Sequence, residues 1–183
     1  MPEATLVRIP SLETARTVLR AHQPGDFDAY ARMWTVPAVT RFIGGRARSR
    51  EESWIRFLRH AGMWAMTGFG FWAIEEKESG RLLGEAGFHE LRRDLTPSIE
   101  GFAEAGWSLV PEAHGRGIAT EVVGAVVAWG DRELRGRRQV CIIDPKNHAS
   151  LRVAQKCGFR DPVEARLGEE TVLLFERERM VFA

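Results

Sequence analysis

The feature that most constrains this chain is a loop with two closely spaced glycines that runs directly into an apolar helix. Residues 111–121 have the sequence PEAHGRGIATE, and an apolar run over residues 122–129 follows. Gly115 and Gly117 lack the Cβ atoms that would keep a ligand away from the main chain. The helix directs its unpaired first-turn N–H groups and its positive dipole end back into the loop. The stretch therefore predicts a binding site for a pyrophosphate.

Two common phosphate-binding motifs do not fit this loop. The dinucleotide fingerprint G-x-G-x-x-G requires a third glycine, and Thr120 occupies that position. The nucleoside triphosphate motif requires Lys followed by Ser or Thr, and neither pair follows the glycines. A plain tight turn before a helix is the alternative explanation of the glycine pair.

A second motif, about one strand and one turn further along, makes the pattern specific. Residues 147–159 have the sequence NHASLRVAQKCGF. The combination of G-x-G-I-A-T-E with N-x-x-S and K-x-G-F resembles the acyl-coenzyme A site of the GNAT N-acetyltransferases. The segments 12–20, LETARTVLR, and 72–74, WAI, with glycines at 80, 84 and 87, resemble the Rim-type branch. That branch includes the ribosomal-protein N-terminal acetyltransferases, and the resemblance covers residues 12–159.

The resemblance implies a single GNAT domain over residues 1–183 with a mixed α/β fold. Its central sheet would be mixed, mostly antiparallel, splayed at the middle and covered by helices on both faces. Apolar periodicity and turn residues predict strands at 17–20, 71–76, 81–89, 101–110 and 139–143, the last parallel to a neighbour. Helices are predicted at 26–34, at 49–63, after the glycine loop, and from Asn147 to a stop at Gly158.

The resemblance also implies that the ligand is acetyl-CoA. Pantetheine would pair with main-chain groups of Leu109 and Val110 at the splay, and Asn147 and Ser150 would contact coenzyme A. The pyrophosphate would lie on the residues of the glycine loop, which are His114, Gly115, Arg116, Gly117, Ile118, Ala119 and Thr120. Most GNAT proteins carry Gln or Arg where His114 stands, so only its main chain is expected to bind. Asn147 as a helix cap alone and Arg116 as a solvated side chain are the alternatives.

Attack of an amine on a thioester needs a route for the amine's proton, a donor for the oxyanion and an acid near sulfur. A main-chain N–H near Leu109 or Val110 is the predicted oxyanion donor. Many GNAT enzymes use as acid a tyrosine four residues before the glycine of the Gly-Phe pair. Ala154 stands there, and the only tyrosine of the chain is Tyr30. Ser150, one helical turn earlier, is therefore the predicted acid, and a positioning role for its hydroxyl is the alternative.

Glu104 is the predicted base. It lies in the segment AEAGW, which resembles the E-x-G-[YW] of the branch, a few residues before the splay. A carboxylate with an ordinary pKa of about 4 would act through ordered water or by stabilising the arriving cationic amine. Glu100 and Glu85 are the alternates, and a solvent-facing strand residue is the alternative for Glu104.

Composition excludes several other classes of function. The chain has 183 residues, and its 26 Lys and Arg against 25 Asp and Glu give a net charge of +1. The net charge therefore creates no overall electrostatic field that would attract the protein to nucleic acid or to a membrane surface. The five histidines show no H-x-x-x-H pattern and are not expected to form a His-Glu cluster, so no metal is expected. Cys141 and Cys157 lack C-x-x-C spacing and are expected to be reduced core thiols. With no apolar signal segment and no long apolar run, a cytoplasmic enzyme is expected.

The acceptor is the least constrained part of the prediction. A protein N-terminus or a small-molecule amine is expected, and dimers are common among proteins resembling this one, so a homodimer is a further expectation. The segments expected to wall the acceptor site are rich in aromatic residues, namely Trp34, Phe42, Trp54, Trp64, Phe69, Phe71 and Trp72. Core packing is the alternative, favoured for Trp72 and for Trp129.

The run RARSR at 46–50 could meet an acidic acceptor or be solvated. The alternative function is an acyl-coenzyme A sensor or structural protein without catalysis.

Overall fold

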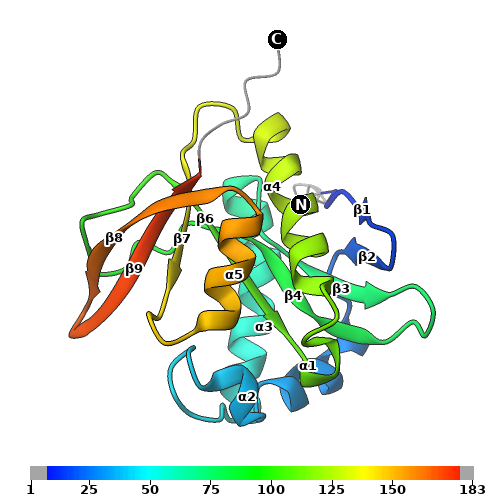
Figure 1. Ribbon diagram of the computed structural model, residues 1–183. Coiled ribbons are helices and arrows are strands. Elements are labelled where there is room, and N and C mark those ends of the chain that lie inside the picture. Colours follow the sequence, from blue (N-terminus) through cyan, green and yellow to red (C-terminus); the bar gives the residue numbers. More distant parts are fainter. Residues whose placement is uncertain (1–7, 178–183) are drawn as a thin grey trace, which may run out of the picture.

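The computed structural model describes residues 8–177. They fold into one nine-stranded sheet with helices packed against it (Figure 1). The strands are β1 (Leu12–Glu13), β2 (Thr17–Arg20), β3 (Phe71–Glu76), β4 (Leu82–His89), β5 (Leu95–Thr96), β6 (Ala103–Leu109), β7 (Gln139–Ile143), β8 (Phe159–Leu167) and β9 (Glu170–Arg177). They lie in the order β1-β2-β3-β4-β6-β7-β9-β8-β5. All neighbours are antiparallel except β6 and β7, which are parallel. The predicted mixed, mostly antiparallel sheet is confirmed.

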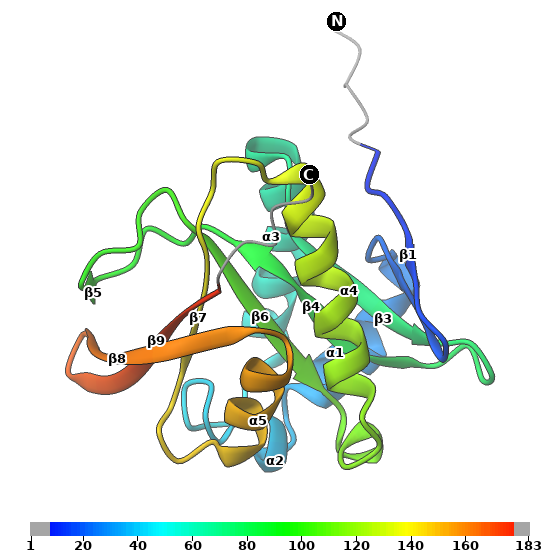
Figure 2. The same cartoon turned by 45° about the horizontal axis from the view of Figure 1, so that its top comes forward.

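Helices cover both faces of this sheet. They are α1 (Phe27–Met33), α2 (Pro37–Thr40), α3 (Arg50–Thr67), α4 (Ile118–Glu133) and α5 (His148–Lys156), with short 3-10 turns at Pro24–Asp26 and Pro111–Ala113. In Figures 1 and 2, α4 and α5 lie on one face, and α1 and α3 lie on the other. This confirms the predicted layers. No helix of the described part of the chain is apolar over a length sufficient to cross a membrane.

The ends of the helices show how local sequence specifies them. Ser49 and Glu52 form a reciprocal capping box at the start of α3, which continues one turn beyond the predicted end at residue 63. Asp26 precedes α1 as predicted, but its carboxylate does not cap α1. It instead accepts hydrogen bonds from the Arg20 guanidinium at 2.7 and 2.8 Å. A charged, bidentate donor is the stronger partner for a carboxylate than a helical N–H group.

The second sequence motif folds as a capped helix followed by a strand. Asn147 Oδ1 accepts a hydrogen bond from Ser150 N–H at 3.2 Å at the start of α5. Gly158 follows the helix with a φ of 89°, a left-handed conformation that favours glycine. Phe159 then begins β8 and is fully buried. The hairpin of β8 and β9 was not predicted from the sequence. It extends the sheet beyond β7.

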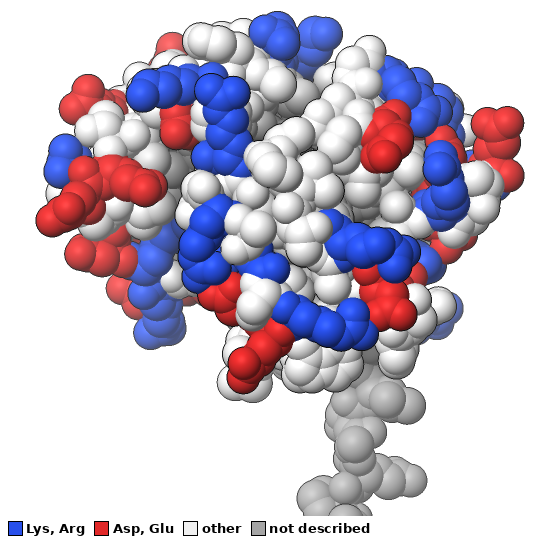
Figure 3. Space-filling model, turned by 90° about the horizontal axis from the view of Figure 1, so that it is seen from below, with Lys and Arg blue, Asp and Glu red and all other residues white. Residues whose placement is uncertain are grey.

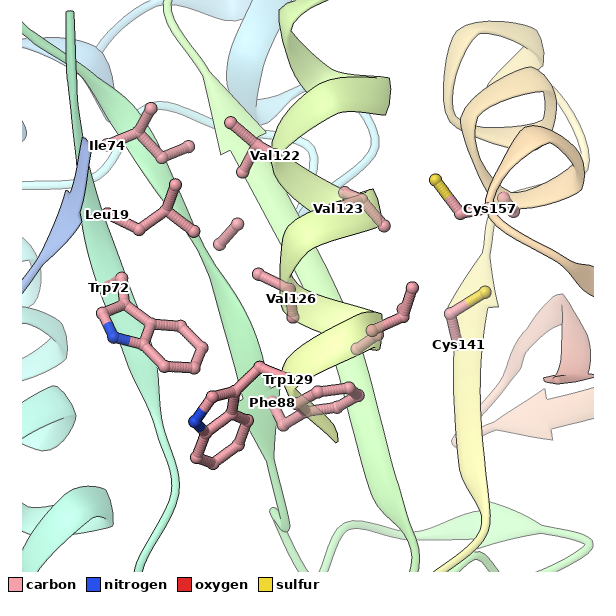
Figure 4. Close-up of a cluster of buried hydrophobic side chains, with 14 of the residues drawn as sticks. Leu19, Trp72, Ile74, Phe88, Val122, Val123, Val126, Trp129, Cys141 and Cys157 are labelled. Carbon is pink, nitrogen blue, oxygen red and sulfur yellow. The ribbon is translucent and has the colours of Figure 1, made fainter. Parts of the chain in front are cut away.

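The main core lies between α4 and the sheet. Figure 4 shows Val122, Val126 and Trp129 of α4 directed toward side chains of β2, β3 and β4, including Leu19, Trp72, Ile74 and Phe88. The rings of Trp64, Trp72 and Trp129 contact one another edge to face, with centroids 4.8 to 5.7 Å apart. Trp72 and Trp129 are therefore core residues, as favoured from the sequence.

The two cysteines are free and buried in the same core, as expected. Cys141 lies on β7 and Cys157 follows the last turn of α5 (Figure 4). Burial raises the pKa of Cys141 well above its usual value and that of Cys157 to about 11. Both thiols are therefore protonated near neutral pH and poor nucleophiles.

Strands β6 and β7 are joined only at one end. Their pairing covers Ala103 with Gln139 and Glu104 with Val140, and Ala103 N–H donates to Arg138 O at 2.9 Å. Beyond Glu104 the two ribbons diverge in both views of the molecule (Figures 1 and 2). The predicted splay at the middle of the sheet is confirmed. It leaves one edge of β6 without a strand partner.

Two glycines of α4 provide a matched test of the core packing. A Cβ atom at Gly130 would lie 2.8 Å from Phe88 Cε2, whereas one at Gly124 would meet nothing within 4 Å. We expect Gly130→Ala to lower the free energy of unfolding by about 1–3 kcal/mol through overpacking. Gly124→Ala should raise it by about 0.5–1 kcal/mol because alanine favours the helix. Urea denaturation measures both changes, and a Gly130→Ala variant as stable as the wild type would contradict the packing.

Candidate active site

Two cavities meet at the splay between β6 and β7. The first, which we call the loop cavity, has a volume of about 420 Å³ and lies against the glycine loop and α5. The second, the sheet cavity, has a volume of about 720 Å³ and lies against β4, β6 and α3. The residues that line both are Phe42, Ile43, Trp107, Ser108, Asn147 and Ser150. A ligand in one cavity can therefore reach a ligand in the other.

The loop cavity gathers most of the residues predicted to bind a cofactor. They are Leu109, His114, Gly115, Gly117, Ala119, Thr120, Asn147 and Ser150. Gly117 is the N-cap of α4 with a φ of 77°, and the first intrahelical bond is from Glu121 N–H to Gly117 O. The N–H groups of residues 118–120 precede that bond and have no partner within the helix. A helix end of this kind binds anions.

A residue far away in the sequence holds this loop in place. Arg16 donates from Nη1 to Arg116 O at 2.7 Å, and from its main-chain N–H to Glu121 Oε1 at 2.8 Å. Its guanidinium also contacts Glu121 Oε2 at 2.6 Å. Arg16 belongs to the N-terminal segment that carries part of the family resemblance. An arginine at position 16 can therefore bond to a main-chain carbonyl of the loop and to Glu121 of α4 at the same time.

Three of the predicted cofactor residues are limited in the groups that they can offer to a ligand. Val110 N–H donates to Leu83 O at 2.8 Å and Val110 O accepts from Ala113 N–H at 3.0 Å, so neither is free for a ligand. The Arg116 side chain pairs with Glu76 at 2.9 Å, because it turns toward the β3–β4 hairpin. The Ile118 side chain is fully buried in the core. Arg116 and Ile118 can contribute only main-chain groups.

The same pairing identifies Leu109 as the residue with a main-chain group at the splay. In an antiparallel pair, successive residues direct their N–H groups to opposite sides of the strand. Val110 N–H is used toward β4, so Leu109 N–H is directed to the side on which β7 has diverged. Leu109 O lies 2.9 Å from His114 Nε2, which fixes the histidine side chain against the strand. Of the two residues named for the oxyanion donor, Leu109 therefore has its N–H on the side of the splay, and Val110 does not.

Sequence reasoning missed two cations of the loop cavity. Arg152 and Lys156 are exposed residues of α5 that line it. Their spacing of four places them on one helical face, which was readable from the sequence. They are suited to bind phosphate groups near the start of α4.

Ser150 and Ala154 differ in their surroundings although they lie one turn apart on α5. Ser150 lines both cavities, and its hydroxyl has no hydrogen-bond partner among the described residues. Ala154 is fully buried in the main core. Tyr30 is equally buried, and its hydroxyl lies 3.1 Å from His60 Nε2. Ser150 is therefore the side-chain hydroxyl of α5 that can reach the junction of the cavities.

Glu104 lies in the sheet cavity and is not the solvent-facing residue of the alternative interpretation. Only 6% of it is exposed, and both its carboxylate oxygens accept from Arg93 Nη2 at 2.7 Å. Oε1 also lies 3.1 Å from His89 Nε2, because His89 pairs with Glu104 across β4 and β6. Burial lowers the pKa of His89, and the contact with Glu104 opposes this. His89 was missed because only the strand register brings it to Glu104.

The two alternate bases do not line either cavity. Glu100 is exposed and pairs with Arg92 at 3.2 Å. Glu85 is fully buried, 2.8 Å from Arg56 Nη2 and 2.7 Å from His60 Nε2. Burial alone would raise the pKa of Glu85, but His60 and Arg56 hold it well below its usual range.

The fold brings together a His-Glu cluster that no sequence motif indicated. His22, His60 and Glu85 present ligand atoms within 4.8 Å of one another. The two histidine rings stack with centroids 4.5 Å apart, and burial together with His60 lowers the pKa of His22 to about 3. The expectation that the histidines form no such cluster was wrong because the three residues come from separate segments. Arg56 already supplies a counter-charge to Glu85.

The aromatic residues divide between the core and the cavities. Trp34, Trp64, Phe69 and Trp72 are buried in the hydrophobic clusters, and Trp54 is 40% exposed. Phe42 lines both cavities, and Phe71 lines the sheet cavity. Trp107 of β6 also lines both. The aromatic wall predicted from the sequence is therefore limited to a few of the residues named for it.

This chain belongs to the GNAT family of acetyltransferases. The model of the acetyltransferase (GNAT) domain matches residues 16–160, which include β6, the glycine loop and α5. The parted strands β6 and β7 and the glycine loop at the start of α4 therefore lie within the part of the chain that matches an acetyltransferase family.

Similar proteins agree with this assignment. The chain is 30% identical over 152 residues to an uncharacterised N-acetyltransferase, YoaA, of Bacillus subtilis, covering 82% of this chain and 83% of that protein. A solved GnaT-family acetyltransferase from Bordetella pertussis is 32% identical, with a TM-score of 0.81 and coverage of 93% and 100%. The ribosomal-protein acetyltransferase RimL, solved in complex with coenzyme A, has a TM-score of 0.72 with coverage of 93% and 98%. At 19% identity, that likeness shows the fold alone.

The lowered pKa of His22 predicts how stability depends on pH. In the unfolded chain this histidine takes up a proton at its usual pKa of 6.5, and in the folded protein its pKa is about 3. This group should therefore leave the free energy of unfolding unchanged above about pH 6.5 and lower it between that pH and about pH 3, by about 1.4 kcal/mol per pH unit. His22→Gln should reduce this slope, whereas His148→Gln, at an exposed position, should not. Denaturation at several pH values from about 7.5 to about 5 measures the slopes; equal slopes for wild type and His22→Gln would contradict the prediction.

Proposed function

We propose that this protein transfers the acetyl group of acetyl-CoA to a primary amine by direct attack in a ternary complex. The observation that carries the proposal is the junction of two cavities at the unpaired edge of β6. One cavity has the anion-binding helix end that a coenzyme A pyrophosphate needs, and the other has buried groups that can take a proton. The acceptor is a protein N-terminus or a small-molecule amine, and the motif at residues 12–20 supports a relation to the Rim-type branch.

Coenzyme A would occupy the loop cavity. Its pyrophosphate would lie on the main-chain N–H groups between Gly115 and Thr120, with Arg152 and Lys156 as additional cations. Its pantetheine arm would follow the unpaired edge of β6 as an added strand, which is a known mode of main-chain recognition. Asn147 retains its side-chain NH₂ for this arm, because only its Oδ1 caps α5. The thioester would then reach Ser150 and Trp107.

The reaction follows from these positions. The amine nitrogen attacks the thioester carbon, and Leu109 N–H stabilises the negative charge that forms on the carbonyl oxygen. The carbon–sulfur bond then breaks, and the thiolate takes a proton from the Ser150 hydroxyl, directly or through water. Ser150 recovers a proton from solvent after the thiol departs. No covalent acyl-enzyme forms, because the cysteines of the described core are buried and protonated.

We assign the amine's proton to the pair of Glu104 and His89. Burial lowers the pKa of His89, so its imidazole is neutral near pH 7 and can accept a proton. Glu104, 3.1 Å away, stabilises the imidazolium that results, and Arg93 Nη2 holds the Glu104 carboxylate in place at 2.7 Å. This modifies the prediction of Glu104 alone, since a carboxylate is a weak base for an ammonium group.

Release of free thiol tests the proposed function. Purified protein is incubated with acetyl-CoA and a panel of small amines and peptides with free N-termini, and coenzyme A formation is followed with a thiol reagent. Thiol release that depends on an amine supports acetyl transfer. Tight binding of coenzyme A without turnover on any acceptor would instead support the non-catalytic sensor. A cytoplasmic location and a homodimer stay predictions.

Gly117→Glu tests the position of the pyrophosphate. A carboxylate at this position would repel the phosphates, so coenzyme A binding should weaken by about a hundredfold or more. Gly117→Asn is the control, because Asn tolerates the left-handed φ of 77° and adds no charge. Calorimetry gives the dissociation constants, and circular dichroism verifies the fold. Unchanged affinity in Gly117→Glu would refute the loop as the phosphate site.

Ser150→Ala tests the acid. If the hydroxyl protonates the leaving thiolate, kcat should fall by about a hundredfold while the dissociation constant of coenzyme A changes little. The α5 cap is Asn147 Oδ1, which accepts from the main-chain N–H of Ser150, so the substitution leaves the cap intact. Steady-state kinetics and calorimetry separate the two effects. A loss of affinity without a loss of kcat would make Ser150 a positioning residue.

A further inference from the structure

The α3 side of the sheet cavity carries more positive charge than its carboxylates neutralise. Arg48, which precedes α3, and Arg56 and Arg59 of α3 all line this cavity. Arg56 pairs with Glu85 at 2.8 Å. No ion pair among the described residues involves Arg48 or Arg59, although Arg46 and Arg50 on the same loop pair with Glu52 and Asp28. Two guanidinium groups on one cavity wall therefore lack a counter-ion.

These arginines also hold buried donors without acceptors. Among the described residues, no hydrogen-bond partner lies within reach of Nε of Arg48, of Arg56 or of Arg93, and all three atoms are buried. Arg93 lies across the same cavity, where its Nη2 serves Glu104. A buried N–H group without an acceptor costs free energy, so proteins rarely leave several at one place. All three groups belong to arginines that line one cavity, so that cavity is rich in donors and poor in acceptors.

The guanidinium groups are held in place before any ligand arrives. Arg56 and Arg48 lie against the ring of Trp34, with their Cζ atoms 4.2 and 5.2 Å from its centroid. Burial and the neighbouring Arg56 lower the pKa of both Arg48 and Arg59. Arginine nonetheless stays charged at neutral pH, and the carboxylates of Glu52 and Glu85 offset the repulsion among the three arginines only in part. A planar carboxylate matches a guanidinium in shape and hydrogen bonding.

The positive charge is local to the cavity. The chain as a whole has a net charge of +1. Figure 3 shows Lys and Arg interspersed with Asp and Glu over one face of the molecule, without a continuous patch of either sign. Of the cavity carboxylates, Glu104 on β6 pairs with Arg93, Asp144 follows β7, and Glu170 lies on β9. An acidic ligand would therefore be oriented inside the cavity and not attracted from a distance.

We propose that the acceptor of this enzyme is an amine that carries a carboxylate, which Arg48, Arg56 and Arg59 bind on the α3 wall. The inference rests on the proposed function and specifies its substrate class. With the carboxylate on α3, the amine would lie toward β6, where Glu104 and His89 take its proton. The carboxylate belongs either to a free amino acid or to an acidic side chain next to a peptide N-terminus.

Matched ligands test this inference by calorimetry on the coenzyme A complex. The first pair is L-phenylalanine and its amide; the second is the amidated dipeptide Ala-Glu and the amidated dipeptide Ala-Gln. The carboxylate member of at least one pair should bind about ten- to a hundredfold more tightly, as expected for hydrogen bonds to charged groups. The pair that shows the preference identifies the source of the carboxylate.

Variants assign the preference to the named arginines. The double variant Arg48→Gln with Arg59→Gln should reduce the ratio of the two affinities to about twofold or less. Arg32→Gln, at an exposed position on α1, is the control and should keep the wild-type ratio. Thermal denaturation verifies that each variant is folded. If the double glutamine variant is not folded, Arg48→Lys with Arg59→Lys takes its place. The lysine pair retains charge but not the planar fork, so its ratio should fall only partly.

Three results would overturn the inference: no carboxylate preference in the wild type, no binding of any of the four ligands, or a preference that survives in the double variant. Calorimetry requires no acetyl transfer. A failure of thiol release therefore counts against the proposed function, whereas a failure of the carboxylate preference counts against this substrate class.

Discussion

The parting of β6 and β7 is the constraint on which the rest of the site depends. Two residue pairs join these parallel strands, and beyond Glu104 the edge of β6 has no strand beside it. Main-chain groups on that edge, Leu109 N–H among them, must then find other partners. The same divergence opens the loop cavity on one side and the sheet cavity on the other, with Ser150 and Asn147 at their junction.

Different forces hold the two halves of the site. The loop half is main-chain geometry: glycines with positive φ, the start of α4, and the bonds from Arg16 to Arg116 O and Glu121. The sheet half is electrostatic, built from the buried carboxylate of Glu104 in the cavity and that of Glu85 behind the arginines of its wall. Glu104 and Glu85 each sit against an arginine and a histidine. Burying such ion pairs costs desolvation free energy, and groups of this kind cluster at functional sites more often than at sites that only stabilise the fold.

Much of the fold could be predicted, and the errors have identifiable causes. Five of the strands, the helix start at Ser49, the stop at Gly158 and the splay followed from local residues or from the family resemblance. Val110 was wrong as a source of free main-chain groups because the register of β4 with β6 decides which N–H faces the splay. The His22, His60 and Glu85 cluster was missed because it joins three segments far apart in the chain.

The sequence by itself determined the glycine loop, the helix that follows it and the Asn147 cap. These depend on backbone conformation and on neighbours within a few residues, so their chemistry is written contiguously. The tertiary structure alone decided which acids and bases meet. His89 reaches Glu104 through strand register, Arg16 reaches the glycine loop from the N-terminal segment, and Arg48, Arg56 and Arg59 share a cavity with β6. Charges act through space over several ångströms, and only the folded chain sets those distances.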